Sequence, residues 1–153
     1  VGADEDVAVG YERWRKALES FDVAVPVLVE NTAGSGNSVM QDLNHYGPLW
    51  EEIGDLNVGV CLDTCHTWAA GADCDAAVDL ITGLTGGIAL VHCNDSKDEH
   101  GSNRDRHENL GKGQIPEDQL IGMVKAANAP TILETPGGVE EHLTDLEWLR
   151  ARL

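Results

Sequence analysis

The stretch Val58-Gly59-Val60-Cys61-Leu62-Asp63 is an unbroken apolar run that ends on a carboxylate. Unbroken rather than alternating apolar character is typical of a strand buried on both faces of a parallel sheet. Three further runs share this character, at residues 23–29, 87–91 and 130–133. The sequence therefore predicts four buried parallel strands.

Segments with helical periodicity separate these runs. Apolar residues recur every three or four positions before the first strand, between the strands and after the fourth. Gly54 is suited to end one helix, Asp73 to cap the next, and Pro116 to stand in the first turn of a later one. The order, one helix followed by four β-α units, predicts an α/β fold. Four such units make half of an eight-stranded barrel or a small doubly wound sheet.

An ionisable residue stands at the end of each predicted strand. The four residues are Glu30, Asp63, His92 and Glu134. A β/α barrel places its chemistry at the carboxyl ends of its strands. A helix cap explains one such residue but not four in succession, so we expect a shared site on one rim of a barrel.

Two further segments add donors to this rim. His66 follows Asp63 in an Asp-x-x-His pattern, and a later loop has Asp105 and His107 on either side of Arg106. In extended backbone the first and third of these loop side chains point to one side and the second to the other. The predicted metal ligands are Glu30, Asp63, His66, His92, Asp105, His107 and Glu134. This mixture of carboxylate and imidazole suits zinc or manganese and exceeds what one tetrahedral ion uses. Two or more ions would suit phosphodiester hydrolysis, because paired ions clamp the attacking and the leaving oxygen.

The chain carries a formal net charge of −17, with a sequence pI near 4.4. Such an excess of acid argues against nucleic-acid binding, which depends on Lys and Arg that neutralise phosphates. Four of the ten basic residues nevertheless fall between positions 97 and 112, and bound divalent ions would add positive charge where carboxylates gather. The candidate nucleic-acid contacts are Lys97, Arg104, Arg106 and Lys112. A plain acidic surface, suited to high salt, accounts for most of the exposed carboxylates.

The remaining features are interpreted as structural. The four cysteines lack a C-x-x-C pair and a secretory context, so we expect reduced thiols that pack as small hydrophobes. Segment 31–36 is rich in glycine but lacks the lysine of a P-loop, and is interpreted as a β-α turn. His45, His100 and His142 are expected to be solvated, and Trp68 to pack in the core. The absence of a long apolar run and of a basic leader predicts a soluble, cytoplasmic chain of one domain.

Five motifs resemble the endonuclease IV family of abasic-site DNA repair nucleases. They lie in order at residues 28–34, 59–71, 91–97, 101–115 and 133–135, and include GVCLDTCHTWAAG, VHCNDSK and GSNRDRHENLGKGQI. Together they extend over nearly the whole chain. The resemblance implies the C-terminal half, about four β-α units, of a xylose isomerase-like TIM (β/α)8 barrel.

The resemblance also implies an activity and a set of roles. A barrel of this family holds three zinc ions, hydrolyses the DNA phosphodiester 5′ to an abasic site and leaves a 3′-hydroxyl. In that pattern Glu30 bridges two ions, and Asp63, His92 and Glu134 complete one of them. The third ion is held by residues matching His66, Asp105 and His107. Glu30 and Glu134 are therefore also the candidate catalytic residues, and manganese is a possible substitute for zinc.

A full barrel of this kind needs about 250 residues, whereas this chain has 153. The resemblance places two further histidine ligands of the first ion upstream of Val1, so two of the three zinc sites are expected to be complete here. We accordingly expect residues 1–153 to form a single partial-barrel domain, poorly stable and nearly inactive alone. The expected partner is double-stranded DNA with abasic sites, without membrane contact, for a full-length protein that is a monomer.

Two alternatives stay open. Metal-dependent sugar isomerases and epimerases of the xylose isomerase-like barrels share the Glu, Asp-x-x-His, His and Glu pattern around a single ion. The loop residues Asp105 and His107 discriminate against them, because isomerisation does not need the further ion. The second alternative is an inactive truncated fragment that binds metal without cutting DNA.

Overall fold

The computed structural model describes residues 6–20, 24–34 and 36–153. In chain order the elements are α1 (Val7–Glu19), β1 (Val27–Glu30), η1 (Val39–Gln41), η2 (Leu43–His45), α2 (Tyr46–Ile53), β2 (Val58–Asp63), α3 (Thr64–Ala69), α4 (Cys74–Thr85), β3 (Leu90–Cys93), β4 (Asp95–Ser96), β5 (His107–Glu108), α5 (Glu117–Ala127), β6 (Thr131–Leu133) and α6 (Val139–Arg150). Val23, which begins the first predicted strand, and Ser35, in the glycine-rich segment, lie outside the described residues.

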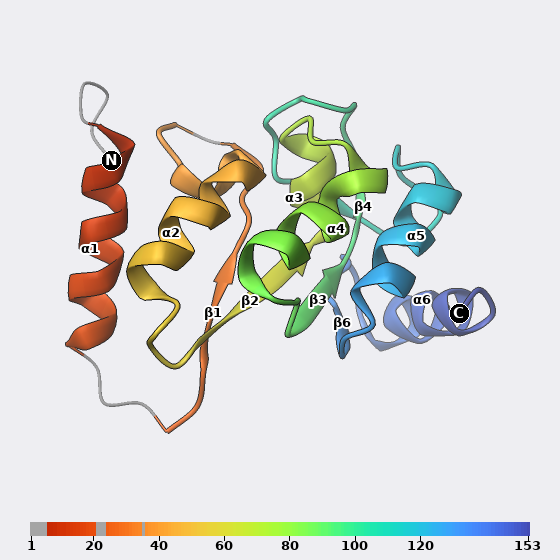
Figure 1. The fold of residues 1–153 in the computed structure, drawn as a ribbon. Helices are drawn as coiled ribbons and strands as arrows, with labels where there is room; N and C mark the ends of the chain where they lie inside the picture. Colours follow the sequence, from red (N-terminus) through yellow and green to blue (C-terminus); the bar gives the residue numbers. More distant parts are fainter. Residues whose placement is uncertain (1–5, 21–23, 35) are drawn as a thin grey trace.

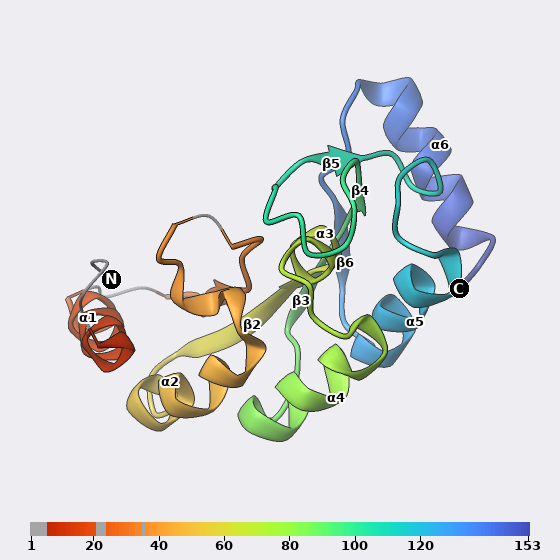
Figure 2. The ribbon, with the colours of Figure 1, turned by 90° about the horizontal axis from the view of Figure 1, so that it is seen from above.

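The four predicted strands form one parallel sheet in the order β1-β2-β3-β6 (Figure 1). Helices in the connections return the chain to the start of the next strand. Helices α2, α4 and α5 lie along one side of the sheet (Figure 2), with α1 packed on α2 and α4 on α5. The predicted α/β fold of four β-α units is confirmed.

The first and third strands begin and end later than predicted. The third was expected at 87–91 but β3 is Leu90–Cys93. Gly86 is the left-handed cap of α4, with φ +92°, and Gly87 follows with φ +157°. These glycines prolong the turn, because such positive φ values are incompatible with a regular strand. The shift places His92 inside the strand, where Asp63 is its partner on β2.

Three local features differ from the sequence prediction. His66 lies in the short helix α3, which was not predicted and which Asp63 caps by accepting a hydrogen bond from the His66 backbone N–H at 2.7 Å. The antiparallel pair of β4 and β5 was not predicted, since two-residue strands have no readable periodicity. Pro116 stands at the N-cap of α5 rather than in its first turn. The expected cap at Asp73 and helix end at Gly54 are confirmed.

The apolar core has two clusters. One lies among α1, α2, α4 and the first two strands, and includes Leu49, Ile53 and Ile81, all fully buried. The other lies between β3, α5 and α6 around Val91 and Leu120. Trp68 packs against both clusters, as predicted, and all four cysteines are free and buried. Among the helices of the described residues, none has both the length and the apolar character that a membrane span requires.

The sheet face opposite the helices carries polar side chains at one end and exposed apolar ones elsewhere. Ile132 is the register partner of His92 on the neighbouring strand, so both side chains stand on the same face. Ile132 is 49 % exposed. Within the described structure, Glu30 and Glu134 are partly exposed at the polar end of this face, whereas Asp63 is buried there.

Replacing Ile53 by alanine is expected to lower the free energy of unfolding by about 2–5 kcal/mol, because the fully buried side chain leaves a cavity in the first cluster. Urea unfolding followed by circular dichroism measures the change. Ile132→Ala is the matched control, and its loss should be clearly smaller because half of that side chain is already in solvent. Equal losses from the two variants would contradict the packing of α2 on the sheet.

Candidate metal centre

The parallel register brings the ends of four strands to one edge. Glu30 ends β1, Asp63 ends β2, His92 lies in β3, and Glu134 directly follows β6. The Nδ1 atom of His92 lies 3.3 Å from Glu30 Oε1 and 3.2 Å from Glu134 Oε2. An imidazole therefore stands between two carboxylates that come from distant parts of the sequence.

Asp63 is the most deeply buried carboxylate of the edge, with no exposed surface. Its Oδ2 accepts a hydrogen bond from Asn94 Nδ2 at 2.7 Å, while its backbone N–H donates to Asn31 Oδ1 at 2.8 Å. Burial raises the pKa of Asp63, and His66 and His107 oppose that rise. A buried carboxylate held by neutral amides favours a nearby cation.

His66 and His107 direct ring nitrogens to one point. Nδ1 of His66 lies 2.9 Å from the Asn31 carbonyl, and Nδ1 of His107 lies 3.2 Å from the Glu134 carbonyl. A carbonyl only accepts, so these contacts place a proton on each Nδ1 and leave Nε2 with its lone pair when the ring is neutral. Both Nε2 atoms are buried without a hydrogen-bond partner, at 3.2 and 3.1 Å from Asp105 Oδ1. Two orphaned imidazole nitrogens beside a carboxylate fit a bound cation.

The electrostatics of the edge agree with this fit. Burial works against the charged form of His66, but the carboxylates of Glu30, Asp63 and Asp105 outweigh it and raise the pKa to about 10. Burial likewise works to raise the pKa of Glu30, yet His66 and His92 bring it below its usual value. The cluster thus attracts positive charge, and a proton on His66 supplies it when no metal is bound.

The donor atoms form four overlapping groups. Within each group the atoms lie within 4.8 Å of one another. Two groups contain only oxygen and nitrogen donors, namely Asp63 with His92 and Glu134, and Asp63 with His66 and His107. The other two groups are Glu30 with Cys61 and His92, and Cys65 with Asp105 and His107. All seven predicted ligands therefore lie in these groups, and their binding of metal stays a prediction.

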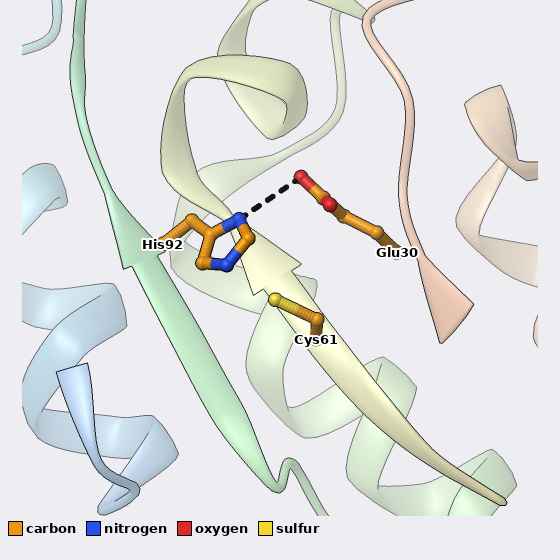
Figure 3. A group of neighbouring side chains, drawn as sticks. All are labelled: Glu30, Cys61 and His92. Atoms are coloured by element: carbon orange, nitrogen blue, oxygen red, sulfur yellow. Dashed lines mark hydrogen bonds and ion pairs between the residues drawn. The ribbon is translucent and has the colours of Figure 1, made fainter. Parts of the chain in front are cut away.

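The grouping differs from the expected one in two respects. Asp63 belongs to both groups of hard donors, rather than to one ion alone. Cys61 and Cys65 border the cluster, whereas the sequence indicated only packing for them. Figure 3 shows Cys61 extending from β2 toward the His92 side, with Glu30 on the neighbouring strand. The signal was present in the sequence, because Cys61 precedes Asp63 by two residues in a strand and so shares its face. Burial raises the pKa of the Cys61 thiol to about 12, with Glu30 and Asp63 adding to the rise.

The two candidate arginines are held by their own loop. Arg106 pairs through Nε and Nη2 with both carboxylate oxygens of Asp98, and Arg104 Nη1 lies 3.5 Å from Asp98 Oδ1. Arg106 thus points away from Asp105 and His107, as the alternation predicted. The Asp98 pairing was not foreseen, and it offsets part of the positive charge. Lys97 and Lys112 are exposed.

Asp95 organises the loop that carries Lys112. Its carboxylate is fully buried and accepts four backbone hydrogen bonds. The donors, at 2.8–3.1 Å, are Ser96, Gly111, Gly113 and Ile115. A Cβ atom on Gly113 would lie 2.3 Å from Asp95 Oδ1, so glycine is required there. The shape of the loop therefore depends on one buried anion.

The three histidines expected to be merely solvated each contact a backbone carbonyl. The partners are Val39 for His45 at 2.7 Å, Ala72 for His100 at 2.9 Å and Thr135 for His142 at 2.7 Å. His100 and His142 are exposed, as expected, whereas His45 is partly buried. The three carbonyl contacts were not predicted, because polar loop sequence does not reveal which carbonyls a fold leaves within reach. None of the three belongs to a donor group among the described residues.

Comparisons with known proteins agree with the fold and with the motifs. Residues 1–152 match the family model described as xylose isomerase-like TIM barrel. Proteins named probable endonuclease 4 are 51 % identical over 152 residues in Mycobacterium tuberculosis, and 49 % identical in Mycobacterium leprae. In both cases the match covers 99 % of this chain and 60 % of the relative. The chain thus spans about 60 % of the length of these curated relatives.

Solved structures give the same picture. The crystal structure of endonuclease IV from Thermus thermophilus has a TM-score of 0.79 and 34 % identity, over 96 % of this chain and 57 % of that one. A D-tagatose 3-epimerase-like protein has a TM-score of 0.72 at 18 % identity, over 95 % of this chain and 54 % of that one, which shows a shared fold alone. The predicted resemblance and the predicted partial-barrel fold are confirmed.

Dialysis of the folded chain against zinc is expected to leave two ions per molecule, measured by atomic emission. His107→Gln should reduce this content by one ion, because it removes one of the two orphaned ring nitrogens. The matched control is His142→Gln, whose ring contacts only a backbone carbonyl and which should keep both ions. Equal zinc content in the two variants would contradict the assignment of His107.

Proposed function

The chain belongs to the xylose isomerase-like TIM barrel family, and we propose that it is the metal-binding part of an endonuclease IV-type DNA repair phosphodiesterase. The fold alone does not decide this, because one barrel supports many reactions. The observation that carries the proposal is the second oxygen and nitrogen group, Asp63 with His66 and His107, beside the strand-end group. The Nε2 atoms of both histidines also lie 3.2 and 3.1 Å from Asp105 Oδ1. A sugar isomerase or epimerase needs only the strand-end group.

The predicted metal ligands have two roles in the proposed reaction, metal binding and proton transfer. One zinc or manganese site would be formed by Glu30, Asp63, His92 and Glu134, and another by His66, Asp105 and His107. The bound ions would supply Lewis acidity and an acidified water for hydrolysis 5′ to the abasic site. Glu30 and Glu134 are the catalytic candidates among the strand-end residues, because their side chains are 33 % and 42 % exposed whereas Asp63 is buried. An accessible carboxylate can take the proton of the attacking water, and a 3′-hydroxyl is left.

Double-stranded DNA with an abasic site is the proposed partner. The basic residues of segment 97–112 lie on the loops that follow β3, next to the metal residues Asp105 and His107. Asp98 holds Arg104 and Arg106 in place, and Lys97 and Lys112 add exposed charge. These four residues, together with bound ions, give a chain of net charge −17 a local site for a phosphate backbone.

The proposed setting follows from the relatives. Residues 1–153 form a single partial-barrel domain, and activity belongs to the barrel that this domain shares with the rest of such a protein. A monomeric, cytoplasmic enzyme without membrane contact is the form we propose for that protein. Because the chain spans about 60 % of its relatives, the sharpest activity test places it in one of them.

A chimera in which this chain replaces the matching residues of the Mycobacterium tuberculosis relative is expected to cut a duplex that contains one abasic site. Asp105→Ala in the chimera should lower the cleavage rate by more than about 100-fold, because a first ligand of one ion is lost. Gel electrophoresis of a labelled strand gives the rate, and extension by a polymerase detects the 3′-hydroxyl.

Asp75→Ala is the matched control for that experiment, since Asp75 lies exposed on α4 outside the donor groups. It should leave the rate unchanged, and circular dichroism should show that both variants fold. Full cleavage by the Asp105→Ala chimera would contradict the proposed role. A folded, zinc-loaded chimera that never cuts abasic DNA would contradict the proposed function.

Lys112→Ala in the same chimera is expected to weaken DNA binding about equally for all sequences. Loss of one phosphate contact should make the plot of log affinity against log salt shallower by about 0.9. Fluorescence anisotropy with a duplex measures both quantities. Lys125→Ala, on α5, is the control, and a slope that falls as much for this variant would argue against a specific contact of Lys112.

A further inference from the structure

Cys61 lies on β2, two residues before Asp63, and its thiol is on the sheet face opposite the helices. Glu30 on β1 is its register partner, and Asp63 lies two residues further along the same strand. Register partners and alternate residues share one face, so the sulfur points to the side where the metal residues gather. Cys61 is 3 % exposed.

The sulfur has two partners with complementary chemistry. Its distances to a carboxylate oxygen of Glu30 and a ring nitrogen of His92 are within 4.8 Å, and those two residues are 3.3 Å apart at Oε1 and Nδ1. In Figure 3 the three side chains converge from three adjacent strands. One sulfur, one nitrogen and one oxygen donor on rigid strands make a site that can accept an ion with little rearrangement.

The softness of the donor atoms determines which metal ion this group prefers. Carboxylate and imidazole donors suit zinc and manganese, whereas a thiolate favours thiophilic ions. We propose that Glu30, Cys61 and His92 form a binding site for a soft divalent ion such as cadmium, distinct in composition from the hard-donor groups and overlapping them at Glu30 and His92. Coordination converts one thiol and one divalent ion into a metal thiolate and releases one proton to solvent.

Overlap makes the two kinds of ion compete. Glu30 and His92 are also predicted zinc ligands. The same donor atom of either residue cannot bind a soft ion in the Cys61 group and zinc in the strand-end group at the same time. A soft ion at Cys61 therefore displaces zinc from the strand-end group. The site would make the protein sensitive to thiophilic metals through a residue outside the predicted zinc ligands.

Cadmium itself is the probe, because a cadmium thiolate absorbs in the ultraviolet and reports sulfur ligation without any activity assay. The measurement uses the whole chain with Cys65→Ser, since Cys65 lies in a similar group with Asp105 and His107. In this background cadmium should produce the charge-transfer band, and Cys61→Ser should abolish it. Cys74→Ser, which removes a buried thiol from α4 outside the groups, should keep it.

Two further arms do not depend on the folding of a Cys61 variant. His92→Gln in the Cys65→Ser background should weaken cadmium binding at least about tenfold, because the thiol loses its nitrogen partner. Added zinc should reduce the cadmium band of the Cys65→Ser chain, since the two ions share residues. A band that survives Cys61→Ser, or that neither His92→Gln nor zinc alters, would overturn the proposal. No arm involves DNA, so these outcomes are separate from those that test the proposed function.

Discussion

The parallel pairing of β2 with its two neighbours determines where the candidate metal ligands lie. It sets Glu30 opposite Cys61 and Asp63 opposite His92, so that side chains distant in sequence meet at one edge. The Asn31 side chain strengthens this pairing, because it accepts from the Asp63 N–H and donates to the Asp63 carbonyl. A shift of one residue between β1 and β2 would turn Asp63 to the helix side and dissolve the cluster.

Gathering carboxylates at this edge of the sheet costs free energy when no metal is bound, and a cation between them would offset that cost. Four carboxylates and three imidazoles gather there, with Asp63 fully buried. Carbonyl contacts orient two of the imidazoles, those of His66 and His107, with the Nε2 atom inward. Orientation by backbone carbonyls means that the ring positions do not depend on the ion, which is the arrangement expected of a preorganised metal site.

Much of the fold followed from simple patterns, since buried parallel strands leave unbroken apolar runs and helices leave a period of about 3.6 residues. The seven donor residues followed from their positions at strand ends and from two short motifs. The pairing of Arg104 and Arg106 with Asp98 could not be predicted, because side-chain contacts within an irregular loop leave no periodic pattern in the sequence. The place of Cys61 beside Glu30 depended on the register of two strands, which neither strand encodes alone. Gly86 and Gly87 delayed β3 for a similarly local reason.

The buried carboxylate of Asp95 has a further consequence for recognition. Backbone amides that converge in a glycine-rich loop commonly form a receptor for phosphate. Here the Asp95 carboxylate already accepts the backbone hydrogen bonds of Gly111, Gly113 and Ile115, so these amides are not available to a phosphate. The loop would therefore present a rigid, already ordered surface to the proposed nucleic-acid partner. Under that proposal, binding affinity would come from side chains such as Lys112, and the entropy of ordering the loop would already be lost during folding rather than on binding.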